Sequence, residues 1–309
     1  MRLVADIGGT NARLAFAHPD TSRVEDPKSY RNANFSSFDD VIADFLSTGA
    51  ARPEQLVVAM AGPVAGNTGR LTNLDWVIDG ATLSSRFSGT PVRVINDLTA
   101  LGYAALQLAP EQLVPVVAEP TAPAAQRQAL VVGIGTGFNV SPVVAYGDRT
   151  ICPAVEAGHT SLFASLASAL DRLKPGLSEH FPTVESLFSG RGRRKFLSLM
   201  TGETVESATP YIAKHGTSEN AVYDSALDDY AMLIGMLLAE LKIAYMPTDG
   251  IFLAGGVARS SLIADRADIC AQAATVPNRF VQLAPSIWII DDDSAALTGC
   301  ASVDVRANA

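Results

Sequence analysis

A short glycine-rich turn near the start of the chain combines groups that suit phosphate binding. The stretch Asp6-Ile7-Gly8-Gly9-Thr10-Asn11 separates two apolar runs, which is typical of paired strands joined by a turn. Adjacent glycines let backbone N–H groups approach an anion closely, and Thr10 adds a hydroxyl. The Asp6 carboxylate suits a hydrated Mg²⁺. We therefore predict a nucleotide-phosphate turn with Asp6 holding the metal through water; the alternative is a tight turn that Asp6 merely caps.

Two further glycine clusters extend this prediction. Gly135-Thr136-Gly137 also lies between two apolar runs, and the two hairpins suggest two related halves that hold one nucleotide, a hypothesis of internal duplication. Gly255-Gly256 follows an apolar run and could face the nucleoside, although packing of a strand against a helix explains this pair equally well.

Asp97 is the best candidate for a catalytic base. Phosphoryl transfer requires a phosphate cradle, a cation and a group that accepts the proton of the attacking hydroxyl. Asp97 follows the strand predicted at residues 92–95, so it is expected at the end of a buried strand, where burial strengthens a base. Asn96 could orient the same substrate. The alternative, that Asp97 caps a helix starting near Leu98, is equally compatible with the sequence.

Three polar residues further along suit a ligand with many hydroxyl groups. Glu156 and His159 lie three residues apart and share one face of a helical turn, and Glu185 stands in an apolar region. A metal site is disfavoured, because E-x-x-H alone lacks further ligands. The chain has one dense basic run, formed by Arg191, Arg193, Arg194 and Lys195. This run could pair with a local acidic surface, cap a helix, or contact an anion or effector.

The elements that position these residues alternate between strands and helices. Apolar runs at residues 56–60, 251–254 and 287–290 predict buried strands, and so does Val92-Arg93-Val94-Ile95. Helical spacing appears at residues 36–46, 98–106, 162–173 and 223–246, in one or two turns at 183–190 ended by a glycine, and from residue 295. This alternation predicts an α/β fold, in which ligands gather at the carboxyl ends of strands. Residues 110–128, rich in Pro, Ala and Gln, read as a connector at a domain boundary.

Bulk composition narrows the classes of partner. The 309 residues carry a net charge of −9, which disfavours nucleic acids and anionic membranes as partners. Three widely spaced cysteines and the absence of a signal-peptide pattern predict reduced thiols in the cytoplasm. Residues 129–146 carry no charge, but their glycines favour buried strands over a membrane helix.

Seven motifs, in order along residues 4–299, resemble those of the bacterial glucokinase family. They are Asp6-Ile7-Gly8-Gly9-Thr10-Asn11-Ala12-Arg13, Leu71-Thr72-Asn73-Leu74-Asp75-Trp76, Ile95-Asn96-Asp97-Leu98-Thr99-Ala100, Gly135-Thr136-Gly137, Glu156-Ala157-Gly158-His159, Ser189-Gly190-x-Gly192 and Leu253-Ala254-Gly255-Gly256. Each motif is short, but together and in order they are specific.

The resemblance implies a two-domain, actin-like (ribonuclease H-like) α/β ATPase fold with a central cleft. Residues 1–109 with 293–309 would form the small domain and residues 110–292 the large one. The implied activity is ATP-dependent phosphorylation of the 6-hydroxyl of glucose by a cytoplasmic homodimer that uses Mg²⁺. The implied base is Asp97, and the implied sugar contacts are Asn73, Asn96, Asp97, Glu156, His159 and Glu185. Nucleotide contacts would be Asp6, Gly8, Gly9, Thr10, Asn11, Gly135, Thr136, Gly137, Gly255 and Gly256.

Three departures from the family pattern lie close to these motifs. Asn139 stands where the family usually has Gly. Asn tolerates a left-handed backbone better than most residues do, so we expect the turn to survive. Ala157 replaces a frequent Gly, and Arg191 and Arg193 flank Gly192 where Pro and an apolar residue are more common. Two alternatives follow: a kinase for another hexose or amino sugar, or a regulator that binds sugar or nucleotide without turnover.

Overall fold

The chain divides into two compact units. A computed structural model describes residues 1–18, 21, 23–47, 52–71, 74–118, 126–147, 149–277 and 284–305. Unit 1 comprises residues 1–108 and 292–309, and unit 2 comprises residues 109–291. Each predicted boundary lies one residue further along the chain than the observed one.

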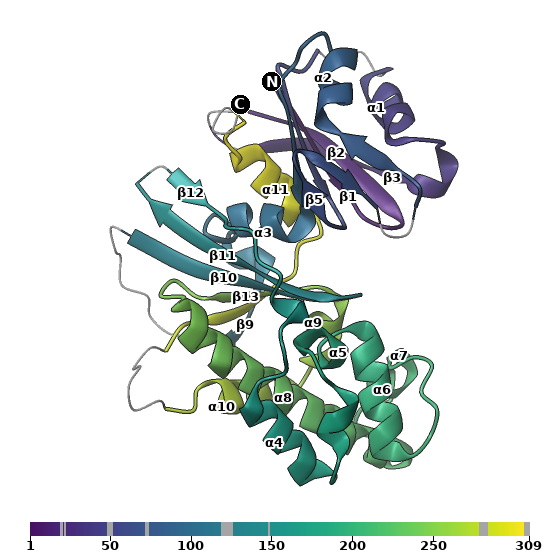
Figure 1. Cartoon of the computed structure of the whole chain (residues 1–309), viewed down its shortest axis with the longest axis vertical. Coiled ribbons are helices and arrows are strands. Elements are labelled where there is room, and N and C mark those ends of the chain that lie inside the picture. The colour runs from purple at the N-terminus through teal and green to yellow at the C-terminus, as the bar shows by residue number, and fades with distance from the viewer. Residues whose placement is uncertain are drawn as a thin grey trace. The chain divides into compact units, whose positions relative to one another are not determined.

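Unit 1 is built on a five-stranded sheet of order β3-β2-β1-β4-β8 (Figure 1). Its strands are β1 (Arg2–Ile7), β2 (Asn11–Ala17), β3 (Val24–Arg31), β4 (Gln55–Met60) and β8 (Val92–Asn96). β1, β4 and β8 are parallel, whereas β2 and β3 run antiparallel to their neighbours. A smaller sheet joins β5 (Val64–Ala65), β6 (Thr68–Arg70) and β7 (Val77–Asp79).

Alternate residues of β1 pack on opposite faces of this sheet. Leu3, Ala5 and Ile7 belong to the core formed with α1 (Phe38–Ser47) and α2 (Gly80–Arg86). Val4 belongs instead to the core formed with α3 (Asp97–Ala105) and α11 (Ala295–Ser302). Helices therefore cover both faces, as buried parallel strands require.

The last helix completes unit 1 although it comes from the far end of the chain. α11 lies against α3, with Gly299 so close to Ala100 that a side-chain Cβ at Gly299 would meet the Ala100 carbonyl oxygen at 1.7 Å. The buried Arg2 guanidinium donates to the carbonyl oxygens of Cys300 and Ala301. The first strand and the last helix thus hold one another in place.

Unit 2 repeats this plan in a six-stranded sheet of order β12-β11-β10-β13-β14-β9. Its strands are β9 (Leu113–Val117), β10 (Gln126–Ile134), β11 (Phe138–Tyr146), β12 (Arg149–Ile151), β13 (Ile251–Ala254) and β14 (Ile287–Ile290). β10 pairs antiparallel with β11 and parallel with β13, as β1 does with β2 and β4. The shared topology of the two sheets supports the hypothesis of internal duplication.

A large helical core covers one face of this second sheet. The helices are α4 (Ala164–Leu173), α5 (Val184–Leu187), α6 (Gly190–Thr201), α7 (Thr209–Ala213), α8 (Ala221–Tyr245), α9 (Gly256–Ser261) and α10 (Arg266–Ala274). Short 3-10 turns lie at η1 (Asn32–Asn34), η2 (Pro110–Gln112), η3 (Ala157–His159), η4 (Leu177–His180) and η5 (Ser218–Asn220). α8 is buried along most of its length against this core, and among the described residues no helix is long and apolar enough to cross a bilayer.

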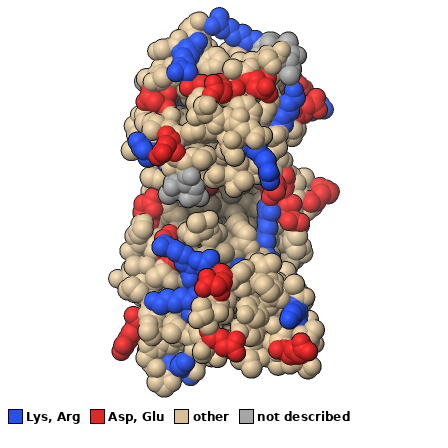
Figure 2. Space-filling view, turned by 90° about the vertical axis from the view of Figure 1, so that its right-hand side faces the viewer, with Lys and Arg blue, Asp and Glu red and all other residues tan. Residues whose placement is uncertain are grey.

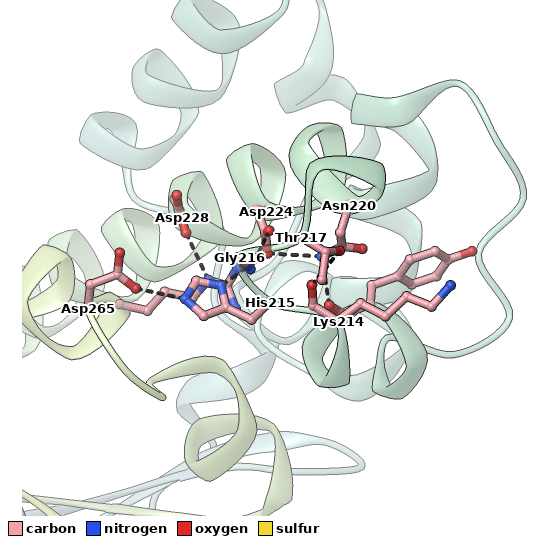
Figure 3. A network of polar contacts seen from close by, with 10 residues as sticks. Lys214, His215, Gly216, Thr217, Asn220, Asp224, Asp228 and Asp265 are labelled. Carbon is pink, nitrogen blue, oxygen red and sulfur yellow. Dashed lines mark hydrogen bonds and ion pairs between the residues drawn. The ribbon is translucent and has the colours of Figure 1, made fainter.

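A polar network around the buried Arg266 side chain fastens α8 to α10 (Figure 3). Arg266 has no exposed surface; its Nη2 donates to Asp224 at 2.6 Å and its Nε to Asp228 at 2.8 Å. His215 lies between Asp224 and Asp265, 3.1 Å from each carboxylate. This network belongs to the helical side of unit 2.

Most predicted elements are present, with two corrections. The connector expected at residues 110–128 contains β9, which pairs antiparallel with β14. The glycine expected to end the helical turns at 183–190 instead begins the next helix, because Ser189 caps α6 by accepting a hydrogen bond from Gly192 N. On the face shown in Figure 2, acidic and basic side chains lie interspersed.

Candidate active site

Three parallel strands of unit 1 end side by side, and the predicted polar residues follow their ends. Ile7, Met60 and Asn96 are paired in register across β1, β4 and β8. The turn that starts at Gly8 and the helix that starts at Asp97 therefore leave the same edge of the sheet. This edge is where ligands gather in α/β folds.

Asn96 and Asp97 have distinct structural tasks. Asn96 caps α3, since its Oδ1 accepts from Leu98 N and Thr99 N. Its Nδ2 donates to Gly62 O at 3.0 Å and to Asp97 Oδ1 at 2.9 Å. The alternative interpretation of Asp97 as the cap is therefore wrong. The Asn96 amide has no donor or acceptor left for a sugar unless one of these four bonds breaks.

Asp97 keeps one carboxylate oxygen available. Its Oδ1 accepts from Leu98 N at 2.8 Å and from Asn96, while among the described residues its Oδ2 has no hydrogen bond. Burial raises the pKa of Asp97 above its ordinary value, against the hydrogen bonds that it accepts. A fixed carboxylate with a raised pKa and a free oxygen is suited to accept a proton.

Asp6 lies at the same sheet edge, where charged side chains of both signs surround its carboxylate. Arg13 Nη1 lies 3.6 Å from Asp6 Oδ2, and Arg13 Nη2 lies 3.4 Å from Asp293. Burial and the negative charge of Asp97 nevertheless raise the pKa of Asp6 to about 7. A cation at this edge would relieve the repulsion between the two carboxylates.

The first glycine turn is held by Asn32, which sequence reasoning missed. Gly8 N donates to Asn11 O, and the buried Asn32 donates from Nδ2 to Gly8 O at 2.8 Å and from its backbone N to Thr10 O. A Cβ at Gly8 would make only an ordinary contact, 3.5 Å from Asn11 O. The fold itself does not require glycine there, which is consistent with space kept for a ligand.

In unit 2, three glycine motifs meet at the turn between β10 and β11. Gly135 N donates to Gly137 O, closing the turn, and Gly135 O accepts from Gly190 N at 2.8 Å. Gly255 has a φ of +96°, and a Cβ there would lie 2.5 Å from Ile134 O. A Cβ at Gly256, by contrast, would meet no atom within 4 Å. Backbone from three separate segments thus forms one glycine-lined surface.

The predicted sugar carboxylates of unit 2 contact the same turn. Glu185 Oε2 accepts from Phe138 N at 3.0 Å, and Glu156 Oε2 accepts from Asn139 Nδ2 at 3.2 Å. Glu156 precedes η3, which His159 ends, and both side chains are exposed. The turn therefore brings Glu156 and Glu185 next to the glycines of the predicted phosphate site.

Comparison with known proteins identifies the fold. The model of the glucokinase family matches residues 3–306. The chain is 31% identical over 269 residues to a glucokinase of Caulobacter vibrioides, covering 83% of this chain and 80% of that protein, and 28% identical over 265 residues to one of Saccharophagus degradans, covering 82% of each. The chain belongs to the glucokinase family.

Solved structures agree with this assignment. A glucokinase from an Antarctic psychrotroph shares 28% identity with a TM-score of 0.78 over 97% of each chain. A Streptomyces griseus ROK family glucokinase, solved with glucose and AMPPNP, shares the fold at 18% identity with a TM-score of 0.63, over 97% of this chain and 98% of that one. The two-domain α/β sugar kinase fold is confirmed, and the family's activity is phosphorylation of glucose by ATP.

The structure shows the backbone conformation or the contacts of three departures from the glucokinase pattern. Asn139 has an extended rather than a left-handed backbone. The expectation that asparagine fits this position because it tolerates a left-handed backbone is therefore wrong. Ala157 likewise has no positive φ. Arg193 is buried and its Nη1 donates to the hydroxyls of Ser260 and Ser261, which ties α6 to the helix that Gly256 begins.

The basic run of this glucokinase-family chain does not form one patch. Arg191 lies 3.4 Å from Glu185, Arg193 points inward, and Lys195 lies over the ring of Phe181. Asn73 lies outside the described residues, so its predicted sugar contact stays a prediction. The described residues contain no group of three or more His, Cys, Asp or Glu side chains that could hold a metal.

Proposed function

We propose that Asp97 is the base that accepts the proton of the glucose 6-hydroxyl during phosphoryl transfer. The observation that carries this proposal is the geometry of its carboxylate, with Oδ1 fixed by Leu98 N and Asn96 and Oδ2 unbonded among the described residues. Asn96 holds that geometry. Glu156, His159 and Glu185 bind the other hydroxyls of the sugar, because carboxylates accept from hydroxyl groups and imidazole can donate or accept.

The nucleotide would be bound by backbone rather than by a P-loop lysine. The residues proposed to contact phosphate are Gly8, Gly9, Thr10, Asn11, Gly135, Thr136 and Gly137. The open space beside Gly256 supports close approach of the nucleoside, next to Gly255. Asp6 would hold Mg²⁺ through water, which fits a carboxylate whose pKa is raised by burial and by the nearby Asp97 carboxylate. MgATP would supply the phosphoryl group, and the positive charge of its Mg²⁺ would offset the negative charge of the phosphates.

The first test is a coupled ADP-release assay with MgATP. Glucose is compared with galactose, mannose, fructose and N-acetylglucosamine. We expect strong turnover with glucose and weak turnover with the others. Preference for a different sugar would contradict the assignment of glucose as acceptor, and sugar binding without turnover, seen by calorimetry, would favour a regulator.

Asp97→Asn tests the base directly. The amide keeps the shape of the side chain but cannot accept the proton, so we expect kcat to fall about 10²- to 10⁴-fold with ATP binding nearly intact. Asp79→Asn is the matched control, because Asp79 is also at a helix start in unit 1, where it caps α2 by accepting from Thr82 N. Near-normal turnover in Asp97→Asn would rule out the assignment.

We also propose that the protein works as a cytoplasmic homodimer, as the family resemblance implies. Sedimentation equilibrium of the purified full chain measures the oligomeric state. A single species of about 65 kDa, twice the mass of 32.4 kDa, is expected. A monomer at micromolar concentration would contradict it.

A further inference from the structure

The turn between β10 and β11 holds both sugar carboxylates of unit 2 through consecutive residues. Phe138 contributes its backbone N–H to Glu185, and Asn139 contributes its side-chain amide to Glu156. Both residues directly follow Gly137, where a Cβ would lie 2.8 Å from Glu185 Oε2. The predicted phosphate turn and the predicted sugar carboxylates therefore share one short segment.

The Asn139 amide fixes the backbone on both sides of Glu156. Its Nδ2 donates to Val155 O at 2.7 Å, and its Oδ1 accepts from Ala157 N at 3.0 Å. Oδ1 also accepts from Val140 N at 2.8 Å, and Nδ2 donates to the Glu156 carboxylate at 3.2 Å. All four hydrogen-bonding positions of the amide are thus used, three of them on residues 155–157.

A glycine at position 139 could make none of these bonds. The backbone of Asn139 lies in β11, paired with Gly133, and its φ is not positive. The conformation therefore does not call for glycine or asparagine. What asparagine adds here is its side chain, and that side chain is directed at the segment that carries Glu156.

We propose that Asn139 is a positioning residue for Glu156, setting the direction of this carboxylate toward the sugar. This inference rests on the proposed function of Glu156 as a sugar contact. Glu156 is exposed, and within the described part of the chain the hydrogen bond from Asn139 is the one that its carboxylate accepts. Hydrogen bonds to a charged group contribute enough that their loss weakens binding about 10- to 100-fold.

Asn139→Gly removes the whole side chain. We expect the KM for glucose, and its dissociation constant by calorimetry, to rise about 10- to 100-fold, with a smaller fall in kcat. The KM for ATP is expected to change less than threefold or so, because the glycine turn itself keeps its bond between Gly135 N and Gly137 O. A glucose KM equal to that of the wild type would overturn the proposal.

Asn139→Asp provides a signature that a structural role alone would not produce. The aspartate keeps the two acceptor bonds at Oδ1, loses the bond to Val155 O, and places a second carboxylate against Glu156, so the two groups repel each other when both are ionised. The KM for glucose should therefore rise with pH as both carboxylates ionise and recover at low pH, where the pair shares a proton. A pH profile parallel to that of the wild type would contradict the proposal, and because this variant is isosteric it decides the question if Asn139→Gly fails to fold.

Asn220→Asp is the matched control. Asn220 also donates to a backbone carbonyl, Tyr211 O at 2.8 Å, and to a carboxylate, Asp224 Oδ1 at 2.9 Å, but it belongs to the polar network of the helical core. This change should lower the melting temperature and leave the glucose KM and its pH dependence unchanged. A pH-dependent glucose KM in Asn220→Asp as well would remove the specificity of the effect and overturn the assignment.

Glu156→Gln separates failure of this inference from failure of the proposed function. If glucose binding in Glu156→Gln equals that of the wild type, Glu156 is not a sugar contact and the proposed function of this residue fails. If Glu156→Gln weakens glucose binding while both Asn139 variants bind normally, only the positioning role fails. Weakened binding in all three variants, with the pH signature in Asn139→Asp alone, is the expected result.

Discussion

At the scale of single residues, Asn96 and Asp97 have separate functions, whereas the sequence left both functions open for Asp97. The sequence allowed Asp97 to be either a base or a helix cap, and the structure gives the cap to Asn96. Because the adjacent asparagine caps α3 and also donates to Asp97, the aspartate is relieved of a structural task. This division makes the function of Asn96 testable separately from its role in stability.

Asn96→Ser should separate capping from orientation. Serine is as good an N-cap as asparagine, so the free energy of unfolding should change by about 1 kcal/mol or less. A single hydroxyl that caps the helix cannot also fix Asp97 Oδ1 as the amide does, so kcat should fall about 10-fold or more. Urea unfolding and the coupled assay measure the two quantities. A fully active and stable Asn96→Ser variant would show that Asn96 is only a cap.

Asp6→Asn should stabilise the protein at high pH while impairing it as an enzyme. The pKa of Asp6 is about 7 in the folded state and near 3.8 in the unfolded chain, so the folded state binds more protons between these values. The free energy of unfolding of the wild type therefore falls as pH rises from about 4 to 7, because Asp6 loses its proton in the folded state. Asparagine does not ionise, and the variant should be more stable than the wild type at pH 8 by on the order of 2–4 kcal/mol, with no gain near pH 4.

Asp79→Asn gives the opposite sign in the same unfolding experiment. Hydrogen bonds from the Thr68 hydroxyl and from Thr82 lower the pKa of Asp79 to about 2, so its contribution to stability is present above pH 4 and lost only in strong acid. Replacing it should lower stability at both pH 5 and pH 8.

The outcome that would contradict the Asp6 prediction comes from the same experiment. Parallel profiles of unfolding free energy against pH for the wild type and Asp6→Asn would show that Asp6 has an ordinary pKa.

Residue types were easier to predict from the sequence than residue partners. Asp6, Asp97, Glu156 and Glu185 stand out because charged side chains next to apolar runs and glycines are unusual. The bonds of Asn32 to Gly8 and of Asn139 to Glu156 join segments 24 and 17 residues apart. No local pattern encodes such a pairing, since it depends on how strands and turns meet in space.

At the scale of elements, two adjacent glycines of one motif have different reasons to be glycine. Gly255→Ala would place a methyl 2.5 Å from Ile134 O at a φ of +96°, so we expect a loss of roughly 2–4 kcal/mol in the free energy of unfolding. Gly256→Ala meets no atom within 4 Å and replaces glycine in the first turn of α9, so stability should stay the same or rise.

Enzyme kinetics then distinguish packing from binding at the second glycine. If the nucleoside approaches Gly256, the alanine variant should raise the KM for ATP about 10-fold or more in a protein of normal stability. Chemical unfolding and ATP titrations at saturating glucose provide both values. An unchanged KM for ATP in Gly256→Ala would leave strand-to-helix packing as the whole reason for the motif.

Elements were predictable where the apolar pattern is continuous. β4, β13 and β14 coincide with runs of four or five apolar residues, because strands buried on both faces need no alternation. β8 was predictable although Arg93 interrupts its apolar residues. β9 was missed because it contains Pro115 and lies in a segment rich in Pro and Ala, a composition that predicts loops. As the last strand in the sheet order, β9 tolerates a proline that a central strand would not.

At the scale of the whole molecule, the chain returns at its end to the unit where it began. Composition and periodicity gave no sign of this; the family resemblance alone implied it. α11 buries Leu297 and Cys300 against Val4 and Val57 of the first sheet. Unit 1 therefore has no complete core until the last residues are present, whereas the core of unit 2 is formed from a continuous stretch of chain.

Gly299→Ala should destabilise unit 1 selectively. A methyl at this position would sit 1.7 Å from Ala100 O, so α11 must shift away from α3, at an expected cost of about 3 kcal/mol or more.

The two tryptophans report the two units separately, because Trp76 lies in unit 1 and Trp288 in β14 of unit 2. In a Trp288→Phe background the fluorescence transition of Trp76 should move to lower urea, while in a Trp76→Phe background that of Trp288 should stay in place. Thr298→Ala, one residue earlier in the same helix, serves as the control and should move neither transition. Equal shifts of both tryptophans in Gly299→Ala would show instead that the two units unfold as one cooperative body.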